Sequence, residues 1–352
     1  MSKYWSELVK GLEPYVPGEQ PRDKKYIKLN TNENPYGPSP KVIAAIKAEA
    51  DDSLRLYPDP TCDVLLDAAA AYFKVKKNMI FTGNGSDEVL AFSFMAFFNP
   101  GEPIYLNDIT YSFYPVYAKL FNIEYDFVEL DDAFKIPTDK LYNSAGGMVL
   151  ANPNAPTGRY LSAEEVRNIV ANNPNRVVII DEAYIEFGGE SVVPLVSEFP
   201  NLLVIQTMSK SHALAGMRIG FAIGNSELVE ALNRVKNSFN SYTLDRLAIV
   251  AAAEALKDVE YYSETWIRIK STREKVTMGL KAMGFNVISS KANFIFISHP
   301  EILAQDIFLK LRQKGILVRY FNKARINNYL RVSIGTDAEM DEFLQAVQQI
   351  VN

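Results

Sequence analysis

Short apolar runs alternate with amphipathic stretches along the chain from about residue 40 to residue 250. Four of these runs lack polar alternation: Met148–Ala151, Val177–Ile180, Leu202–Gln206 and Ile219–Ile223. Strands with this pattern are usually buried on both faces of a sheet. Between the first two runs, LSAEEVRNIVANN has a helical pattern, and Ser162 and Glu165 are spaced as a capping box. Strand, helix and strand in this order predict a mainly parallel sheet with helices on both faces.

The same pattern divides the chain into three parts. The start is polar and irregular until Ser39 and Pro40, which are typical of a helix N-cap and first helical position. After the alternating region come a long charged helix over 259–283, short strands, and a last helix that Thr336 and Glu339 open as a second capping box. Single cores stop growing near roughly 250 to 300 residues. We therefore expect an N-terminal segment (1–38), a large domain (39–255) and a smaller α+β domain (256–352).

Composition and charge exclude several classes of function. The 352 residues are 48% hydrophobic and carry a net charge of −5 without a basic block, which argues against a nucleic-acid partner. Cys62, His212 and His299 are the only cysteine and histidines of the sequence, too few for a zinc or iron–sulfur centre. No stretch resembles a signal peptide or a membrane span. We expect a cytoplasmic protein without a metal or a membrane partner, acting on small molecules.

The motif TGNGSDE precedes an apolar helical run and places Gly85, Ser86 and Asp87 at the predicted helix start. Backbone N–H groups at such a start attract a phosphate group. The structural alternative is that Ser86 or Asp87 only caps the helix after a flexible turn. The glycine spacing is not a dinucleotide fingerprint, and a Walker A loop is absent. Taken alone, the motif leaves phosphate binding and simple capping open.

Asp181 ends a predicted buried strand in VVIIDEAYIEF. Ligands of open α/β sheets bind outside the carboxyl ends of the strands, so this carboxylate is well placed to meet one. An Asp-Glu pair after a strand also resembles a Walker B or metal site. The other residues that those sites require are missing from the sequence.

Lys210 follows another apolar strand in LLVIQTMSKSHALAGMRIGF, with Thr207 and Ser209 before it and Arg218 eight residues later. A lysine near the sheet interior and a fixed cation has a lowered pKa and suits a Schiff-base nucleophile. A lysine that extends from a strand end to solvent is the structural alternative. A phosphate-binding helix start, a carboxylate and a lysine at one sheet edge are together what pyridoxal 5′-phosphate needs.

These motifs resemble those of the fold-type I aminotransferases, most closely the histidinol-phosphate aminotransferase family. The matching stretches run in the family's order from about residue 15 to residue 336: LNTNENPYGPSP, RLYPDP, TGNGSDE, PNAPTG, DEAYIEF, TMSKSHALAGMRIGF, KANFIF and LVRYFNKARINNYLRVSIGT. The resemblance implies the α/β fold of fold-type I pyridoxal-phosphate-dependent transferases. It also implies a homodimer, and an N-terminal segment that packs with the small domain and the substrate site.

The resemblance assigns residues to the cofactor. Lys210 would form the Schiff base with the cofactor's aldehyde and then move a proton between the substrate α-carbon and the cofactor. Asp181 would pair with the ring nitrogen, and Tyr184 would hydrogen-bond the phenolic oxygen. Tyr111 would stack on the ring, with an ordinary core tyrosine as the alternative. The phosphate would be held by Gly85, Ser86, Asp87, Thr207, Ser209 and Arg218, and by Tyr57 from the partner subunit.

The resemblance also assigns substrate contacts. Arg331 would hold the carboxylate of glutamate or 2-oxoglutarate, whereas Tyr15 and Arg319 would reach the phosphate of histidinol phosphate. An exposed ion pair is the alternative for Arg319. The stretch PNAPTG departs from the family's frequent PNNPTG, so Ala155 stands where an asparagine normally contacts the ring oxygen. Asn154, one position away, is the candidate substitute.

The expected reaction transfers an amino group between histidinol phosphate or imidazole acetol phosphate and glutamate or 2-oxoglutarate, by a ping-pong mechanism in histidine biosynthesis. An aromatic amino acid aminotransferase stays open, because a tyrosine-rich pocket also takes phenyl rings. A phosphothreonine decarboxylase stays open as well, since it keeps phosphate recognition but releases carbon dioxide. A regulatory protein is disfavoured, because the family motifs begin within the first 40 residues and leave no room for a DNA-binding segment.

Overall fold

The computed structural model describes residues 3–15 and 18–351. In this part of the chain the larger of the sheets, hereafter the large sheet, has seven strands in the order β2-β8-β7-β6-β5-β3-β4. They are β2 (Ile80–Asn84), β3 (Ile104–Asn107), β4 (Tyr125–Val128), β5 (Met148–Ala151), β6 (Val178–Asp181), β7 (Leu202–Thr207) and β8 (Ile219–Gly224). Neighbours from β7 to β4 pair in parallel, whereas β8 is antiparallel to both β7 and β2. The predicted α/β class with a mainly parallel sheet is confirmed.

Helices cover both faces of the large sheet, because successive strand residues point to opposite sides. In β6, Ile179 faces one hydrophobic cluster, while Val178 and Ile180 face the other. The first cluster includes residues of α4 (Gly85–Phe97), α5 (Tyr114–Leu120) and α7 (Ser226–Phe239). The second includes residues of α2 (Pro40–Glu49), α3 (Asp63–Phe73), α6 (Ala163–Ala171) and α8 (Arg246–Lys257). The strands are therefore buried on both sides, as their uninterrupted apolar runs predict.

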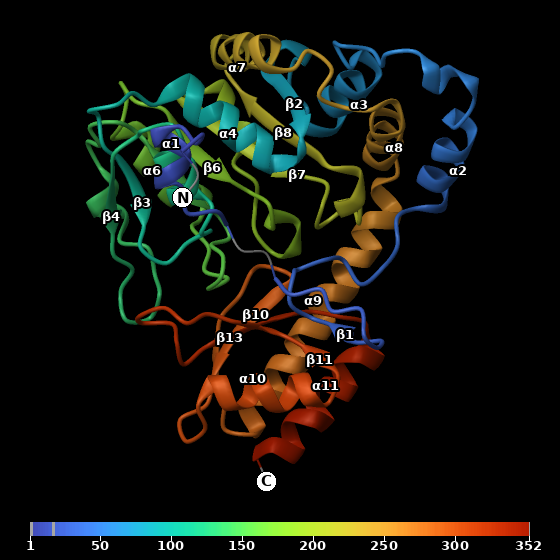
Figure 1. Ribbon diagram of the computed structural model, residues 1–352, viewed down its shortest axis with the longest axis vertical. Helices are drawn as coiled ribbons and strands as arrows, with labels where there is room; N and C mark the ends of the chain where they lie inside the picture. Colours follow the sequence, from blue (N-terminus) through green and yellow to red (C-terminus); the bar gives the residue numbers. More distant parts are fainter. Residues whose placement is uncertain (1–2, 16–17, 352) are drawn as a thin grey trace.

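A second, small sheet has the antiparallel order β12-β13-β10-β9. Its strands are β9 (Asn286–Ile288), β10 (Phe294–Ser298), β12 (Arg319–Tyr320) and β13 (Leu330–Ser333). It shares a hydrophobic cluster with α9 (Val259–Ala282), α10 (Ala304–Gln313) and α11 (Asp337–Val351). In Figure 1 these elements form the lower part of the molecule, which α9 connects to the upper part with the large sheet.

The N-terminal segment crosses from one part of the molecule to the other. Its short helix α1 (Glu7–Gly11) lies beside the upper part, and its strand β1 (Ile27–Lys28) lies on the lower part (Figure 1). There β1 pairs in parallel with β11 (Ile316–Leu317). The segment that leads to Ser39 is thus anchored on the lower part by β1 before α2 begins.

Local sequence signals set three helix starts. Ser39 caps α2, with Pro40 in its first turn. Ser162 and Glu165 form the capping box of α6. Before α11, the Thr336 backbone N–H donates to the Glu339 carboxylate at 2.8 Å, and the Glu339 N–H donates to the Thr336 hydroxyl at 3.3 Å. All three predicted starts are confirmed.

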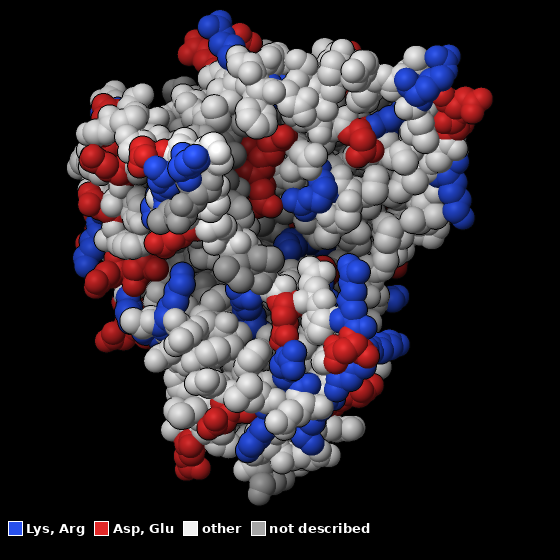
Figure 2. Space-filling view, in the orientation of Figure 1, with Lys and Arg blue, Asp and Glu red and all other residues white. Residues whose placement is uncertain are grey.

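Charges of both signs are distributed over the surface. Figure 2 shows acidic and basic side chains interspersed across one face of the molecule. Within residues 3–15 and 18–351, no helix is long and apolar enough to span a lipid bilayer.

Candidate active site

A cavity of about 260 Å³ lies where the ends of β6 and β7, the start of α4, the small sheet and residues 30–33 meet. Most of the site residues predicted from the sequence line it: Tyr15, Ser86, Asp87, Tyr111, Asp181, Tyr184, Thr207, Ser209, Lys210, Arg218, Arg319 and Arg331. Among the described residues, Gly85, Asn154 and Tyr57 lie outside its wall. Residues that are far apart in the sequence thus come together around one space.

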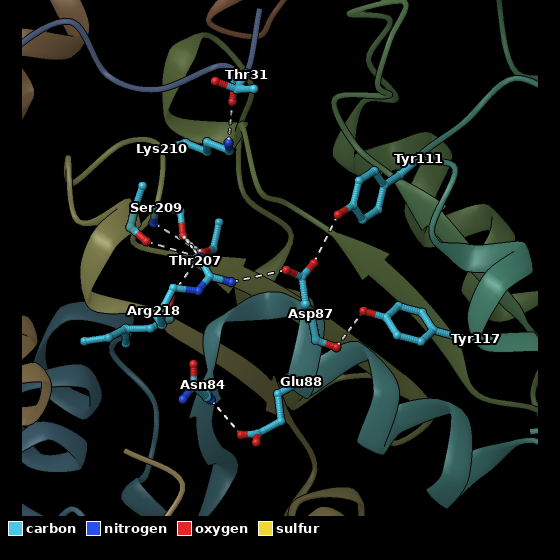
Figure 3. A network of polar contacts seen from close by, with 12 residues as sticks. Thr31, Asn84, Asp87, Glu88, Tyr111, Tyr117, Thr207, Ser209, Lys210 and Arg218 are labelled. Carbon is cyan, nitrogen blue, oxygen red and sulfur yellow. Dashed lines mark hydrogen bonds and ion pairs between the residues drawn. The ribbon is translucent and has the colours of Figure 1, made fainter. Parts of the chain in front are cut away.

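Lys210 lies in the connection between β7 and β8. Its Nζ donates to the Thr31 carbonyl oxygen at 2.9 Å (Figure 3), and Asn34 Nδ2 donates to the Lys210 carbonyl at 3.1 Å. Burial, and after it the nearby Arg331 cation, lowers the pKa of Lys210 to about 8. Compared with an ordinary lysine, more of this amine is neutral near pH 7, and the neutral amine is the nucleophile.

Asp181 is the last residue of β6 and is 5% exposed. Its carboxylate accepts hydrogen bonds from Tyr114 Oη at 2.7 Å and from the Ala183 N–H at 3.1 Å. Burial nevertheless raises the pKa of Asp181 to about 6. A cationic N–H group placed beside this carboxylate would favour its charged form.

The start of α4 is left open toward the cavity. Asn84 occupies the N-cap position without a side-chain cap, and the Glu88 carboxylate accepts the Asn84 N–H at 2.7 Å. Neither Ser86 nor Asp87 caps the helix, so the simple capping alternative is wrong for both. Ser86 and Asp87 of the first turn line the cavity, at the end of the helix where the dipole favours an anion.

Arg218 joins this helix start to the end of β7 (Figure 3). Its Nη2 lies 3.2 Å from Asp87 Oδ2, and its Nη1 donates to Ser209 Oγ at 3.4 Å. Thr207 Oγ1 and Ser209 Oγ are 3.0 Å apart. This cluster collects a guanidinium, two hydroxyls and a helix N-terminus, which is a donor set suited to a phosphate group.

Two glycines allow this close packing. A Cβ atom on Gly220 would lie 2.4 Å from the Ser86 backbone nitrogen. A Cβ atom on Gly85 would lie 2.5 Å from Arg218 Nη2, and Gly85 has a φ of 79°. Both positions need glycine, because a side chain would collide with the helix start or its arginine. Gly85 thus shapes the cluster from outside the cavity wall.

Aromatic rings and two arginines form the rest of the wall. The Tyr15 ring lies 6.3 Å from the Tyr111 ring between centroids. The Arg331 guanidinium carbon lies 5.4 Å from the Phe294 ring centroid, and Nη2 donates to the Asn30 carbonyl at 2.9 Å. Arg331 Nε is buried and has no hydrogen-bond partner among the described residues. Part of this guanidinium is therefore available to an anionic ligand.

Asn154 and Tyr57 have other surroundings than the cavity. Asn154 Nδ2 donates to the Ile109 carbonyl at 2.9 Å and to Thr157 Oγ1 at 3.0 Å, so its amide holds the loop together. Ala155 lines the cavity instead. Tyr57 is 78% exposed, and its ring stacks on another tyrosine at the surface. Asn154 as a ring contact and Tyr57 as a partner contact stay predictions.

Several wall residues have no role assigned from the sequence. Thr31, Asn32 and Glu33 line the cavity. Tyr114 lies outside the wall and donates a hydrogen bond to Asp181. The first three lie in LNTNENPYGPSP, where a dense polar run without helical or strand periodicity is the signal that points to them. Tyr114 is three residues after Tyr111, and nothing in its spacing distinguishes it from a core tyrosine.

The wall fits the cofactor expected from the sequence. It offers a buried amine for an aldehyde, a carboxylate for a ring nitrogen, and the Arg218 cluster for a phosphate. The unpartnered Arg331 Nε adds a place for a further anionic group. Among the described residues, no group of three or more histidine, cysteine, aspartate and glutamate side chains is arranged to hold a metal ion.

Comparison with known proteins places these features in a family. The family model "Aminotransferase class I and II" matches residues 24–347. A histidinol-phosphate aminotransferase of Clostridium botulinum is 58% identical over 352 residues, covering 100% of this chain and 99% of that protein. One of Clostridium acetobutylicum is 58% identical over 351 residues, covering 100% of both.

A similar solved structure bears the same name as the two sequence relatives. The histidinol-phosphate aminotransferase of Sinorhizobium meliloti, crystallised with pyridoxal-5′-phosphate, has a TM-score of 0.90 and 25% identity, covering 100% of this chain and 98% of that one. The predicted fold-type I architecture is confirmed by this likeness. Since the family model spans most of the sequence and the relatives match it from end to end, the chain belongs to the aminotransferase class I and II family of pyridoxal-phosphate-dependent enzymes.

Proposed function

We propose that this enzyme exchanges an amino group between histidinol phosphate or imidazole acetol phosphate and glutamate or 2-oxoglutarate. The observation that carries the proposal is the cavity wall, where Arg319, Arg331 and Tyr15 lie together with Lys210. Both amino donors carry an anionic group besides the amine, and paired guanidinium groups suit such ligands. The full-length relatives that are 58% identical bear the name of this activity.

In this proposal Lys210 is the catalytic residue. When bound, pyridoxal phosphate supplies an electron sink that stabilises negative charge at the substrate α-carbon. Lys210 Nζ would hold the cofactor through its aldehyde, and the freed amine would accept and return the proton at the substrate α-carbon. Its pKa of about 8 lets Nζ both accept and return a proton near neutral pH.

The remaining residues bind and orient. Asp181 would pair with the ring nitrogen of the cofactor and keep it protonated, and hydrogen bonds from Tyr114 and Ala183 fix its carboxylate in place. Tyr184 would hydrogen-bond the phenolic oxygen and Tyr111 would stack on the ring. Arg218 would hold the phosphate together with Gly85, Ser86, Asp87, Thr207 and Ser209. Arg331 holds the substrate carboxylate of glutamate, and Arg319 with Tyr15 holds the phosphate of histidinol phosphate.

A stopped-flow absorbance experiment tests the substrate assignment. The cofactor-loaded enzyme is mixed separately with histidinol phosphate, histidinol, phenylalanine and phosphothreonine, and the loss of the cofactor's visible band is timed. We expect the fastest change with histidinol phosphate and a much slower one with histidinol. Arg319→Ala removes this difference, whereas Arg312→Ala, which deletes an exposed ion pair with Glu19, keeps it. Preference for phenylalanine, or carbon dioxide release from phosphothreonine, would contradict the proposal.

We further propose that the enzyme acts in the cytoplasm as a homodimer, with the domain division 1–38, 39–255 and 256–352. Exposed apolar side chains around Tyr57 support an interface there, since Leu54 and Leu56 are 54% and 51% exposed. If the partner subunit's Tyr57 completes each site, Tyr57→Ala and Lys210→Ala proteins are each impaired, and their mixture regains activity through hybrids with one intact site. A mixture that stays as weak as its components, despite subunit exchange shown by native mass spectrometry, would contradict the shared site.

A further inference from the structure

Tyr184 faces the cavity from the segment after β6, and its hydroxyl already has one partner. Asn32 Nδ2 donates to Tyr184 Oη at 3.0 Å. Asn32 is 1% exposed and lies in the N-terminal segment, 152 residues before Tyr184. Phe294 of β10 holds the Tyr184 ring edge to face, with 5.1 Å between centroids. The ring and the hydroxyl oxygen of Tyr184 are thus both fixed by other segments.

Ser333 of β13 fixes the orientation of the Asn32 side chain. The Asn32 backbone N–H donates to Ser333 Oγ at 2.9 Å, and Ser333 Oγ donates to Asn32 Oδ1 at 2.8 Å. Asn293 Nδ2 donates to the Asn32 carbonyl at 3.0 Å. Because Oδ1 accepts the Ser333 hydroxyl, the NH₂ group of the amide is the end that faces Tyr184.

The backbone at Asn32 also favours this residue type. Its φ is 58°, in the left-handed region that glycine and asparagine adopt far more readily than other residues. The side-chain contacts and the backbone conformation therefore both favour asparagine at this position. A short amide is the group that can occupy this conformation and still bridge Ser333 and Tyr184.

The direction of these bonds determines where the Tyr184 hydrogen points. An oxygen that accepts from Asn32 keeps its own hydrogen for another acceptor. We propose that Asn32 is a positioning residue: held by Ser333, it directs the hydroxyl hydrogen of Tyr184 into the cavity, toward the phenolic oxygen of bound pyridoxal phosphate. This inference rests on the proposed function for its cofactor. Ser333 belongs to the small sheet. The orientation of the Tyr184 hydroxyl therefore also depends on how the small sheet packs against the rest of the cavity wall.

A hydrogen bond to the phenolic oxygen stabilises the deprotonated form of the cofactor chromophore, so its loss raises the pH midpoint of the visible absorbance change. Other titratable groups that act on Tyr184 are Arg331, Asp181 and Tyr15. Lys210 shares the same cavity. The variants below leave these four residues in place.

Asn32→Gly is the main test, because it deletes the side chain at a φ that glycine adopts without strain. In pH titrations of the cofactor-loaded enzyme, we expect the absorbance midpoint to rise by about one unit. Tyr184→Phe raises it similarly, and Asn32→Gly adds nothing in the Tyr184→Phe background. Asn122→Gly is the matched control, since Asn122 is an exposed asparagine with a φ of 56°. Its midpoint stays at the wild-type value.

Two results would overturn the positioning role: an unchanged midpoint in Asn32→Gly, or an equal further rise in the Tyr184→Phe background. If thermal melting shows that Asn32→Gly does not fold, Ser333→Ala decides the question in both backgrounds, with a smaller rise in the same direction expected. The titration uses no substrate, so an error in the substrate assignment does not affect it. Wild-type protein that develops no visible band with pyridoxal phosphate would contradict the proposed function and this inference together.

Discussion

Lys210 and Arg331 donate hydrogen bonds to adjacent carbonyl groups, those of Thr31 and Asn30, at 2.9 Å each. Two consecutive backbone carbonyls therefore hold both cations at the cavity wall. Their proximity also matters electrostatically, because among the charged groups Arg331 has the largest effect on the pKa of Lys210 and lowers it. The arginine proposed to bind substrate thus also tunes the amine proposed to react.

The first prediction concerns the pH dependence of the Lys210 amine. In protein without cofactor, trace acetylation of Lys210 followed by mass spectrometry rises with pH around a midpoint near 8, as the pKa of about 8 requires. Arg331→Gln removes a cation that disfavours the charged amine, so the midpoint moves up by roughly one unit. Arg312→Gln, at an exposed ion pair, leaves it unchanged. A wild-type midpoint above pH 10 would contradict the lowered pKa.

The second prediction concerns turnover without Lys210. Lys210→Ala lowers kcat by at least about 10² to 10⁴-fold, the contribution typical of a positioned acid–base group, and pyridoxal phosphate binds without a covalent link. Steady-state assays and borohydride reduction followed by mass spectrometry measure the two effects. Lys257→Ala, which removes an exposed partner of Glu254, serves as the control and keeps wild-type values. Normal turnover in Lys210→Ala would rule out the assigned role.

The third prediction uses a pair of glycines with nearly equal backbone strain. Gly85 and Gly101 have φ values of 79° and 83°, but only at Gly85 would a Cβ atom collide, with Arg218. Displacing this guanidinium weakens a charged hydrogen bond, so Gly85→Ala raises the Kd for pyridoxal phosphate about 10- to 100-fold. Gly101→Ala pays the same backbone strain in open space and keeps the wild-type Kd. Equilibrium dialysis distinguishes them, and equal losses would show that strain alone is responsible.

The fourth prediction concerns stability and Asp181. Its folded-state pKa of about 6 lies above the ordinary value of 3.8, so folding favours the protonated carboxyl. This contribution is present below pH 4 and is lost as pH rises through 6. Relative to wild type, cofactor-free Asp181→Asn therefore gains roughly 2.5 kcal/mol in unfolding free energy between pH 4 and pH 8, while its turnover falls.

Urea unfolding of the cofactor-free proteins at both pH values measures this difference. The comparison between two pH values cancels the hydrogen-bond loss that the amide causes at either one. Asp126→Asn, at an exposed position of β4, is the control for removing a carboxylate from the surface. A pH-independent difference for Asp181→Asn would mean that its carboxyl is ionised equally in the folded and unfolded states.

Sequence patterns predicted the large sheet and much of its site for a physical reason. Parallel strands bring their carboxyl ends to one edge, so Asp181 and Lys210, each after an apolar run, had to lie near each other. The strand order and the reversed course of β8 were not predictable, because they depend on which strands pair across long sequence separations. The helix starts at Ser39, Ser162 and Thr336 were predictable, since capping is local.

Contacts between segments that are far apart in the sequence could not be predicted from it. Asn32 meets Tyr184 and Ser333 across 152 and 301 residues, and no periodicity links these positions. Asn154 and Ala155 show a second limit. In an irregular loop, neighbouring side chains can point in unrelated directions, so the sequence could not tell which of the two faces the cavity.

The antiparallel course of β8 has a consequence for how the site is assembled along the chain. Its first residue lies at the edge where β7 ends, which brings Arg218 beside the loop that carries Lys210. A parallel strand of six residues would have delivered that arginine about 20 Å away, at the opposite edge. Lys210 and Arg218 therefore lie near the two ends of the loop that connects β7 to β8. An insertion or deletion between them would therefore change the distance that separates the amine from the guanidinium.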